Sequence, residues 1–181
     1  EAWNAYQALP FPTTKHEAWR WTDISKMPIE SFEPGKGGSI SAIPAALLEP
    51  VADAEHGGEI LLTGEHNQVH LDAALAEAGV IFTDLKHAFE AAPHVVEKIL
   101  GKVIRPDEEK FSALAGAMAQ DGILLYVPKG LQVESPLHSL LWIAGQNEAA
   151  FSHLLVYLEE GSSVTFVHES SSPLEEQVPG F

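Results

Sequence analysis

The chain contains no cysteine among its 181 residues. This absence excludes disulfide bonds, a thiolate nucleophile, and zinc or iron–sulfur sites built on cysteine ligands. Any metal held by these residues would need histidine, aspartate or glutamate as its ligands. The search for a metal site therefore narrows to the nine histidines and the 26 acidic residues.

Basic residues are scarce: ten Lys and Arg oppose 26 Asp and Glu, for a formal net charge of −16. An acidic surface repels phosphate backbones and anionic lipids, which argues against a nucleic-acid or membrane partner. No apolar run reaches the roughly 18 to 20 residues that a membrane-spanning helix needs. The first residues also lack the basic and apolar regions of a secretory signal. We therefore expect no nucleic acid, no membrane and a cytoplasmic location.

Catalytic motifs are missing as well. The sequence has no G-x-S-x-G elbow, no P-loop and no G-x-G-x-x-G element, so serine hydrolysis and nucleotide binding have no local support. Adjacent acids occur at residues 107–109, 159–160 and 175–176. General acid–base work needs one carboxyl buried enough to hold its proton, whereas these groups fall at predicted helix starts, turns or a polar tail. We predict that the chain is not an enzyme, with no catalytic or cofactor-binding residue.

Helical patterns dominate the first 121 residues. Residues 2–9 place their apolar side chains near one helical face. Thr14 and Glu17 have the spacing of a capping box, so a short helix is expected to start at Lys15. Start signals and apolar faces predict further helices after Asp72, after Asp84, from Pro93 and from Pro106, the last being the longest and carrying Phe111, Leu114, Ala115 and Met118 on its buried side.

Between the early helices the pattern changes twice. Residues 33–59 are rich in Gly, Pro, Ser and Ala, which predicts a loop with at most one short helix near residues 45–49. Two short apolar runs, residues 59–63 and 68–71, then flank a turn sequence and predict a β-hairpin.

From Asp121 onward the pattern is that of strands. Apolar β runs are expected near residues 123–127, 137–144, 153–158 and 163–168, each closed by a turn, while residues 170–173 show no strong element. Even spacing with no helix in between favours stacked turns of sheet over a βαβ fold. We predict an α+β chain with a helical domain and a small hairpin in residues 1–121, and the start of a β core in residues 122–181.

Three histidines in the β region, His138, His153 and His168, are each separated by 15 residues. In a stacked coil, equal spacing would superpose them, and three imidazoles can hold one metal ion. The favoured alternative is that they are ordinary polar residues at strand ends. His66 and His70 are four apart, but they lie in a turn and a strand, so they do not form a helical zinc motif. No metal site is predicted, and the three spaced histidines are kept as candidates.

Two tryptophans, Trp19 and Trp21, flank Arg20. Trp and Arg dominate interface hot spots, so this cluster is a candidate partner-binding surface. Packing into the core is favoured, because a small helical domain needs large side chains to bury enough apolar area.

Two segments carry a family pattern. Residues 9–23 read LPFPTTKHEAWRWTD. Within residues 110–138, D-G follows the predicted helix, Y-V-P-K-G ends the first predicted strand, and E-S-P-L-H leads into the second. Together they resemble the SufB/SufD family of the Suf iron–sulfur cluster assembly system. The N-terminal signature and the lack of cysteine favour a SufD-like member. The signature residues are Glu17, Ala18, Trp19, Arg20, Thr22, Asp121, Gly122, Pro128, Lys129 and Gly130.

The resemblance implies an N-terminal helical domain, a right-handed parallel β-helix and a C-terminal helical domain that binds the SufC ABC-type ATPase. Family members are much longer than 181 residues, so we expect an N-terminal fragment with only the first coils of the β-helix. The cluster-forming region, including a functional histidine of SufD, lies later in the β-helix and matches no position here. SufC binding is therefore expected to be missing from this fragment.

The resulting hypothesis is a scaffold subunit of a SufBCD-like complex that is non-catalytic alone. It would act through a SufB-like paralogue and a SufC-like ATPase, with the iron–sulfur cluster assembled by the full complex and no cofactor bound by this fragment. The alternatives are a β-helix enzyme acting on polysaccharide or acyl groups, and a metal-binding module using histidines. An open coil end exposes unpaired hydrogen-bonding groups, so self-association, for example as a homodimer, is also expected.

Overall fold

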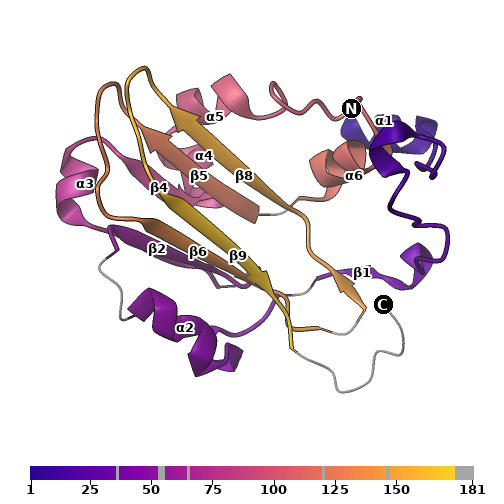
Figure 1. The fold of residues 1–181 in the computed structure, drawn as a ribbon, viewed down its shortest axis with the longest axis horizontal. Helices are drawn as coiled ribbons and strands as arrows, with labels where there is room; N and C mark the ends of the chain where they lie inside the picture. Colours follow the sequence, from indigo (N-terminus) through magenta and orange to yellow (C-terminus); the bar gives the residue numbers. More distant parts are fainter. Residues whose placement is uncertain (36, 53–55, 65, 120, 146, 174–181) are drawn as a thin grey trace.

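Helices and β-sheets are both present in the computed structural model, which describes residues 1–35, 37–52, 56–64, 66–119, 121–145 and 147–173 (Figure 1). The α-helices are α1 (Ala2–Ala8), α2 (Ala45–Ala52), α3 (Ala73–Glu77), α4 (Leu85–Ala91), α5 (Pro93–Ile99) and α6 (Lys110–Met118). Short 3-10 helices are η1 (Glu17–Trp19), η2 (Ile29–Ser31) and η3 (Ile40–Ala42). Over the described ranges, no helix is long and apolar enough to cross a bilayer.

The strands of the described residues are β1 (Glu33–Pro34), β2 (Gly58–Leu62), β3 (Gln68–Leu71), β4 (Ile81–Asp84), β5 (Asp121–Val127), β6 (Leu137–Trp142), β7 (Glu148–Ala149), β8 (Ser152–Leu158) and β9 (Phe166–Ser171). These strands form three sheets. One has the order β3-β2-β6-β9, the second β4-β5-β8, and the third joins β1 to β7. The predicted hairpin is confirmed, because β2 and β3 pair antiparallel.

From β5 onward the longer strands alternate between the two larger sheets. β5 pairs in parallel with β8, and β6 pairs in parallel with β9. Asp121 aligns with Ser152 and Leu137 aligns with Phe166, so both pairs join residues about 30 positions apart. The chain thus passes from one sheet to the other and back, and lays each strand beside the strand of the previous passage.

The main core lies between the two larger sheets. Alternate residues of each strand point inward, as the two-residue period of a strand requires. The core includes Ile60 and Leu62 of β2, Phe82 of β4, Ile123, Leu125 and Val127 of β5, and Leu137 of β6. Helices α4 and α5 pack against Leu124 on the outer face of β5. Ile43 and the neighbouring α2 pack against Leu140 and Trp142 on the outer face of β6.

Two predicted helix starts are wrong. The Thr14 capping box does not form: Nδ1 of His16 accepts the Thr13 N–H at 3.0 Å, and the short helix η1 begins only at Glu17. The longest described helix begins at Lys110 rather than Pro106. Glu109 and Ser112 form its capping box, while Arg105 pairs with Asp107 at 2.6 Å and holds the preceding residues in a turn.

Strand positions also differ in detail from the prediction. The last strand begins at Phe166 rather than residue 163. Ser163 forms only an isolated bridge with Gln132, and residues 164 and 165 lie outside the strand. Ser170 and Ser171, predicted to lack regular structure, lie in β9. In α4, Leu85 and Ala88 are buried, whereas Phe89 is 51% exposed. The domain division at residue 121 remains a prediction; β2 and β4 pair directly with β6 and β5.

Candidate functional site

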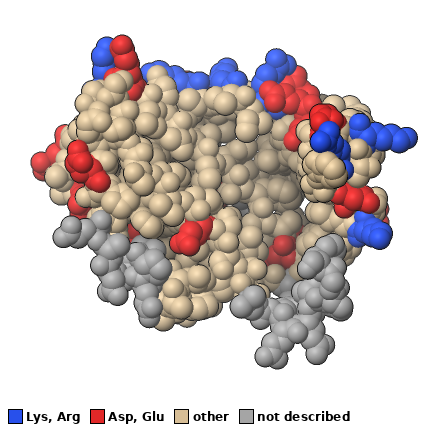
Figure 2. Space-filling view, viewed as in Figure 1, with Lys and Arg blue, Asp and Glu red and all other residues tan. Residues whose placement is uncertain are grey.

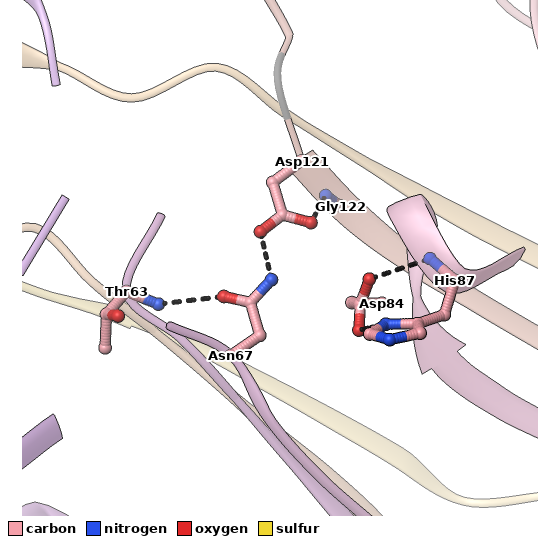
Figure 3. Close-up of polar contacts among 6 residues, drawn as sticks. All are labelled: Thr63, Asn67, Asp84, His87, Asp121 and Gly122. Atoms are coloured by element: carbon pink, nitrogen blue, oxygen red, sulfur yellow. Dashed lines mark hydrogen bonds and ion pairs between the residues drawn. The ribbon is translucent and has the colours of Figure 1, made fainter. Parts of the chain in front are cut away.

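Asp121 lies at the start of β5, where the chain leaves α6 and enters the sheet (Figure 3). One carboxylate oxygen accepts the backbone N–H of Gly122 at 2.7 Å. The other accepts a hydrogen bond from the side-chain amide of Asn67, whose own carbonyl oxygen accepts the backbone N–H of Thr63 at 3.3 Å. These bonds connect the turn of the β2–β3 hairpin to the first residue of β5.

The electrostatic setting of Asp121 is unusual for a carboxylate. Burial raises its pKa above the ordinary 3.8, and the hydrogen bonds from Asn67 and Gly122 oppose that rise. The nearby Asp84 carboxylate adds a smaller upward contribution. A half-buried carboxyl with a raised pKa is a candidate proton donor or acceptor. Both oxygens are already used by protein donors, so the geometry favours a structural role for Asp121.

The raised pKa of Asp121 can be tested by replacing it with asparagine and measuring stability as a function of pH. Since the folded-state pKa lies above the unfolded value, the unfolded state loses its proton first as pH rises, and the carboxyl weakens folding across the window just above 3.8. We expect the stability of Asp121→Asn, relative to wild type, to increase from below pH 3.8 to neutral pH. Urea unfolding of both proteins across that range measures the difference. A difference that is constant with pH, or that falls, would contradict the assignment.

A second polar contact lies beside the first, at the junction of β4 and α4 (Figure 3). Asp84 is only 1% exposed and caps α4 by accepting the backbone N–H of His87 at 3.0 Å. Its other oxygen is 2.5 Å from Nδ1 of His87, whose side chain is 69% exposed. An aspartate that orients an imidazole is also half of a catalytic pair. Within the described residues His87 bonds to no hydroxyl group, so this contact is a helix cap.

Removal of the cap should be measurable. Asp84→Ala deletes the acceptor for the His87 N–H and is expected to lower the free energy of unfolding by about 1 to 2 kcal/mol. Asp84→Asn keeps an acceptor at the same place and should retain most of the stability. Urea denaturation of wild type and the two variants measures these free energies of unfolding. If both variants lose the same free energy of unfolding, the cap does not stabilise this junction.

The three evenly spaced histidines do not meet. His153 lies on β8, in a different sheet from His138 and His168. His168 aligns with Ser139 rather than with His138, so the two imidazoles point to opposite faces of their sheet. Nδ1 of His168 is 2.8 Å from the Ser139 hydroxyl. The candidate histidine column does not form, because the strand pairing joins residues 29 or 31 apart in alternate sheets. The favoured interpretation of these histidines as separate polar residues fits this register.

Strand register brings a different set of histidines together. The rings of His70 and His138 lie 6.4 and 6.3 Å from the ring of His56, between centroids. The Nδ1 atoms of His56 and His138 are buried without a hydrogen-bond partner in the described part of the chain. The spacing of these histidines in the sequence did not predict the cluster. His70 and His138 become neighbours only because both align with Glu59 of β2, from the two strands on either side of it. Among the described residues, no three His, Asp or Glu side chains are arranged to hold a metal ion.

The N-terminal signature residues divide into a packed and an exposed set. Trp19 stacks on Phe111 of α6 with 5.3 Å between ring centroids, and its indole N–H donates to Glu109 at 3.2 Å. Trp21 is 86% exposed, and the Arg20 guanidinium lies 4.8 Å from its ring centroid. The packing interpretation is thus correct for Trp19 and wrong for Trp21. Three signature residues near them, Glu17, Ala18 and Thr22, are exposed.

The signature turn after β5 stacks on the turn after β8. Gly130 has a φ of +75°, which glycine adopts without strain, and its N–H donates to the Glu160 carbonyl at 3.0 Å. Lys129 extends the contact through its ammonium group, 2.6 Å from the Glu160 carboxylate. Pro128 begins this turn directly after the last residue of β5. The Y-V-P-K-G pattern therefore builds one contact between successive passages of the chain.

The sequence of this chain is similar to proteins of one family. The family model described as "SufBD protein N-terminal region" matches residues 57–138, the stretch from β2 to β6 that contains the Asp121 and Pro128 motifs. The iron–sulfur cluster assembly protein SufD of Bacillus subtilis is 31% identical over 174 residues, covering 92% of this chain and 39% of that protein.

Two further similar proteins carry names from the same family. An iron–sulfur cluster assembly SufBD family protein of Synechocystis is 33% identical over 147 residues, or 75% of this chain and 31% of that protein. The iron–sulfur cluster assembly protein SufB of Bacillus subtilis is 33% identical over 100 residues, or 55% of this chain and 22% of that protein. The chain thus spans less than two fifths of the length of these relatives. The matches confirm the resemblance predicted from the sequence motifs, and the chain belongs to the SufB/SufD family.

Proposed function

We propose that this chain is part of a SufD-like scaffold subunit for iron–sulfur cluster assembly, which acts through protein partners and is not a catalyst by itself. The observation that carries the proposal is the 31% identity to an iron–sulfur cluster assembly SufD over 92% of the chain. The match to SufB of the same organism covers only 55% of the chain, which favours the SufD side of the family.

The non-catalytic part of the proposal rests on how the buried Asp84 and the half-buried Asp121 are used. Asp84 caps α4, and Asp121 joins the hairpin turn to β5. Each carboxylate has both oxygens occupied by neighbouring protein groups. A cleft of free carboxylates, as the polysaccharide-enzyme alternative requires, has no support in these contacts.

We also propose that the alternating parallel strands are the first coils of a right-handed parallel β-helix. Support comes from the pairing of strands about 30 residues apart and from the stacked turns at Gly130 and Gly161. Three inward-facing residues of β8, Leu154, Val156 and Leu158, are 37 to 47% exposed at the open end of the stack. In Figure 2 the surface over β8 and β9 is mostly uncharged, as expected of a face covered by further coils.

The partners proposed for the whole protein are a SufB-like paralogue and a SufC-like ATPase. Iron and sulfide would be substrates of the assembled complex, and the residues described here would shape the scaffold without binding a cofactor. The acidic balance of the chain, at −16, supports protein partners over nucleic acid.

Size-exclusion chromatography tests the proposal. The full-length protein that contains this chain should co-elute with its SufB-like and SufC-like partners, and the mixture should form a cluster when supplied with iron and sulfide. The 181-residue chain alone is the matched control and should fail to retain the ATPase. Full-length protein that elutes apart from both partners would refute the scaffold proposal.

A further inference from the structure

Ser139 is a polar residue on the inward face of β6, where its neighbours on the same face, Leu137 and Leu141, pack into the main core. Ser139 is 3% exposed. Nδ1 of His168, the residue aligned with it on β9, lies 2.8 Å from its hydroxyl oxygen. Within the described ranges this is the one hydrogen bond of the Ser139 hydroxyl. The pair of β6 and β9 therefore carries a buried polar link beside the apolar core.

The direction of this hydrogen bond follows from burial. A hydroxyl hydrogen without an acceptor is costly inside a protein. Nδ1 of His168 is the acceptor available to the Ser139 hydroxyl among the described residues, so Ser139 donates and Nδ1 carries no hydrogen. The hydrogen of the neutral imidazole is then on Nε2, which lies 3.3 Å from the Ser170 hydroxyl and donates to it. The arrangement thus requires a neutral imidazole in one tautomer.

Protonation of His168 breaks this arrangement. A protonated imidazole donates from both nitrogens and accepts from neither, so the Ser139 hydroxyl hydrogen would lose its acceptor. Burial lowers the pKa of His168 below its ordinary 6.5, and the Glu169 carboxylate opposes that change. Because the folded-state pKa lies below the unfolded value, the unfolded state takes up the proton first as pH falls. The stability that depends on neutral His168 is therefore present above pH 6.5 and is lost as the pH falls below it.

Few charged groups face His168. Its neighbour Glu169 and His138 of β6 lie on the outward face of the sheet. Across the core, β4 and β5 direct two carboxyl groups inward, those of Asp84 and Asp121, and both already accept hydrogen bonds from protein groups. The inward residues of β2 and β8 carry no titratable side chain. A proton on His168 therefore has no carboxylate at ion-pair distance among the described residues.

We propose that the hydrogen bond between Ser139 and His168 is a pH-sensitive link that holds β9 on β6 at neutral pH and releases it in mild acid. In the part of the chain that the structure describes, β9 has β6 as its only partner strand, so no second neighbour holds it when the link is lost. The release stays local, because β2, β5 and β6 each pair with strands on both sides.

Native-state amide exchange on the unaltered chain measures the release. After correction for intrinsic exchange rates, the opening constant of the β9 amides should rise roughly two- to tenfold between about pH 7.5 and about pH 5.5, as expected for the loss of one hydrogen bond. The β2 amides are the internal reference and should change less. The midpoint of the rise should coincide with the titration of the His168 imidazole, followed by its nitrogen chemical shifts. Unchanged β9 protection, or a rise that follows another histidine, would overturn the proposal.

A substitution separates His168 from the other histidines. His168→Asn keeps an acceptor near the position of Nδ1 and has no group that titrates in this range, so β9 opening should become the same at both pH values. His94→Asn, at an exposed position on α5, is the matched control and should keep the wild-type pH dependence. A wild-type pH dependence in His168→Asn would refute the link. If that variant does not fold, the comparison of the two midpoints in the unaltered chain decides.

Discussion

Alanine at Gly122 is expected to disrupt the pairing of β5 with β8. A Cβ at this position would lie 2.1 Å from the carbonyl oxygen of His153 and 2.8 Å from its nitrogen. Both are backbone atoms, so relief requires the two strands to separate rather than a side chain to rotate. Overpacking of this kind costs about 1 to 3 kcal/mol, and we expect Gly122→Ala to fall at the upper end. Urea unfolding and amide exchange along β8 would record the change.

Gly130→Ala is the control for loss of a glycine. A Cβ at Gly130 would have no heavy atom within 4 Å, but its φ of +75° strains any other residue, so a loss of roughly 1 to 2 kcal/mol is expected. The amides of β8 should keep their protection in this variant. If Gly122→Ala proves no more destabilising than Gly130→Ala, the close approach of β5 to β8 at His153 is not tight in solution.

Replacing Lys110 with methionine is expected to release the N-terminal helix. The Lys110 side chain is buried, and its ammonium group donates to the carbonyls of Tyr6 and Leu9 at 2.5 and 2.9 Å. It also lies 4.0 Å from the Tyr6 ring centroid and 4.7 Å from that of Phe11. Hydrogen bonds from a charged donor contribute about 1.5 to 3 kcal/mol each, and methionine replaces neither of them.

Limited proteolysis between α1 and η1 is the direct readout for Lys110→Met, since a released helix exposes that segment. Cleavage should be much faster in the variant, while the unfolding of the β-sheets should change little. Lys102→Met, at an exposed position after α5, is the matched control and should be cleaved like wild type. Unchanged cleavage of Lys110→Met would mean that the aromatic contacts alone hold α1 in place.

Elements with a strong local signal could be predicted from the sequence. The β2–β3 hairpin follows from two apolar runs around a turn, and the Asp84 cap follows from an acceptor placed before an apolar helical face. The capping box at Thr14 was wrong because the same spacing also suits a turn, and His16 accepts the Thr13 N–H instead. The backbone N–H groups of a short segment can be accepted by more than one nearby side chain. A local sequence pattern therefore does not settle which side chain forms the cap.

The polar sites could not be predicted, because they depend on contacts between distant parts of the chain. Asn67 reaches Asp121 across 54 residues, and Lys110 reaches Tyr6 across 104. The family motif singled out Asp121, but its partner and its raised pKa require the fold. The cluster of His56, His70 and His138 likewise appears only once the strand register is known.

The strand pairing over about 30 residues also sets how the chain can fold. β8 finds its only described partner in β5, and β9 finds its own in β6, so each later strand needs an earlier one as its template. Closing such long loops is slow, because the loop entropy is lost before the pairing is gained. We therefore expect assembly to be directional. The pairs β2–β6 and β4–β5, one in each of the two larger sheets, form first. The strands β8 and β9 are then added to them in order along the chain.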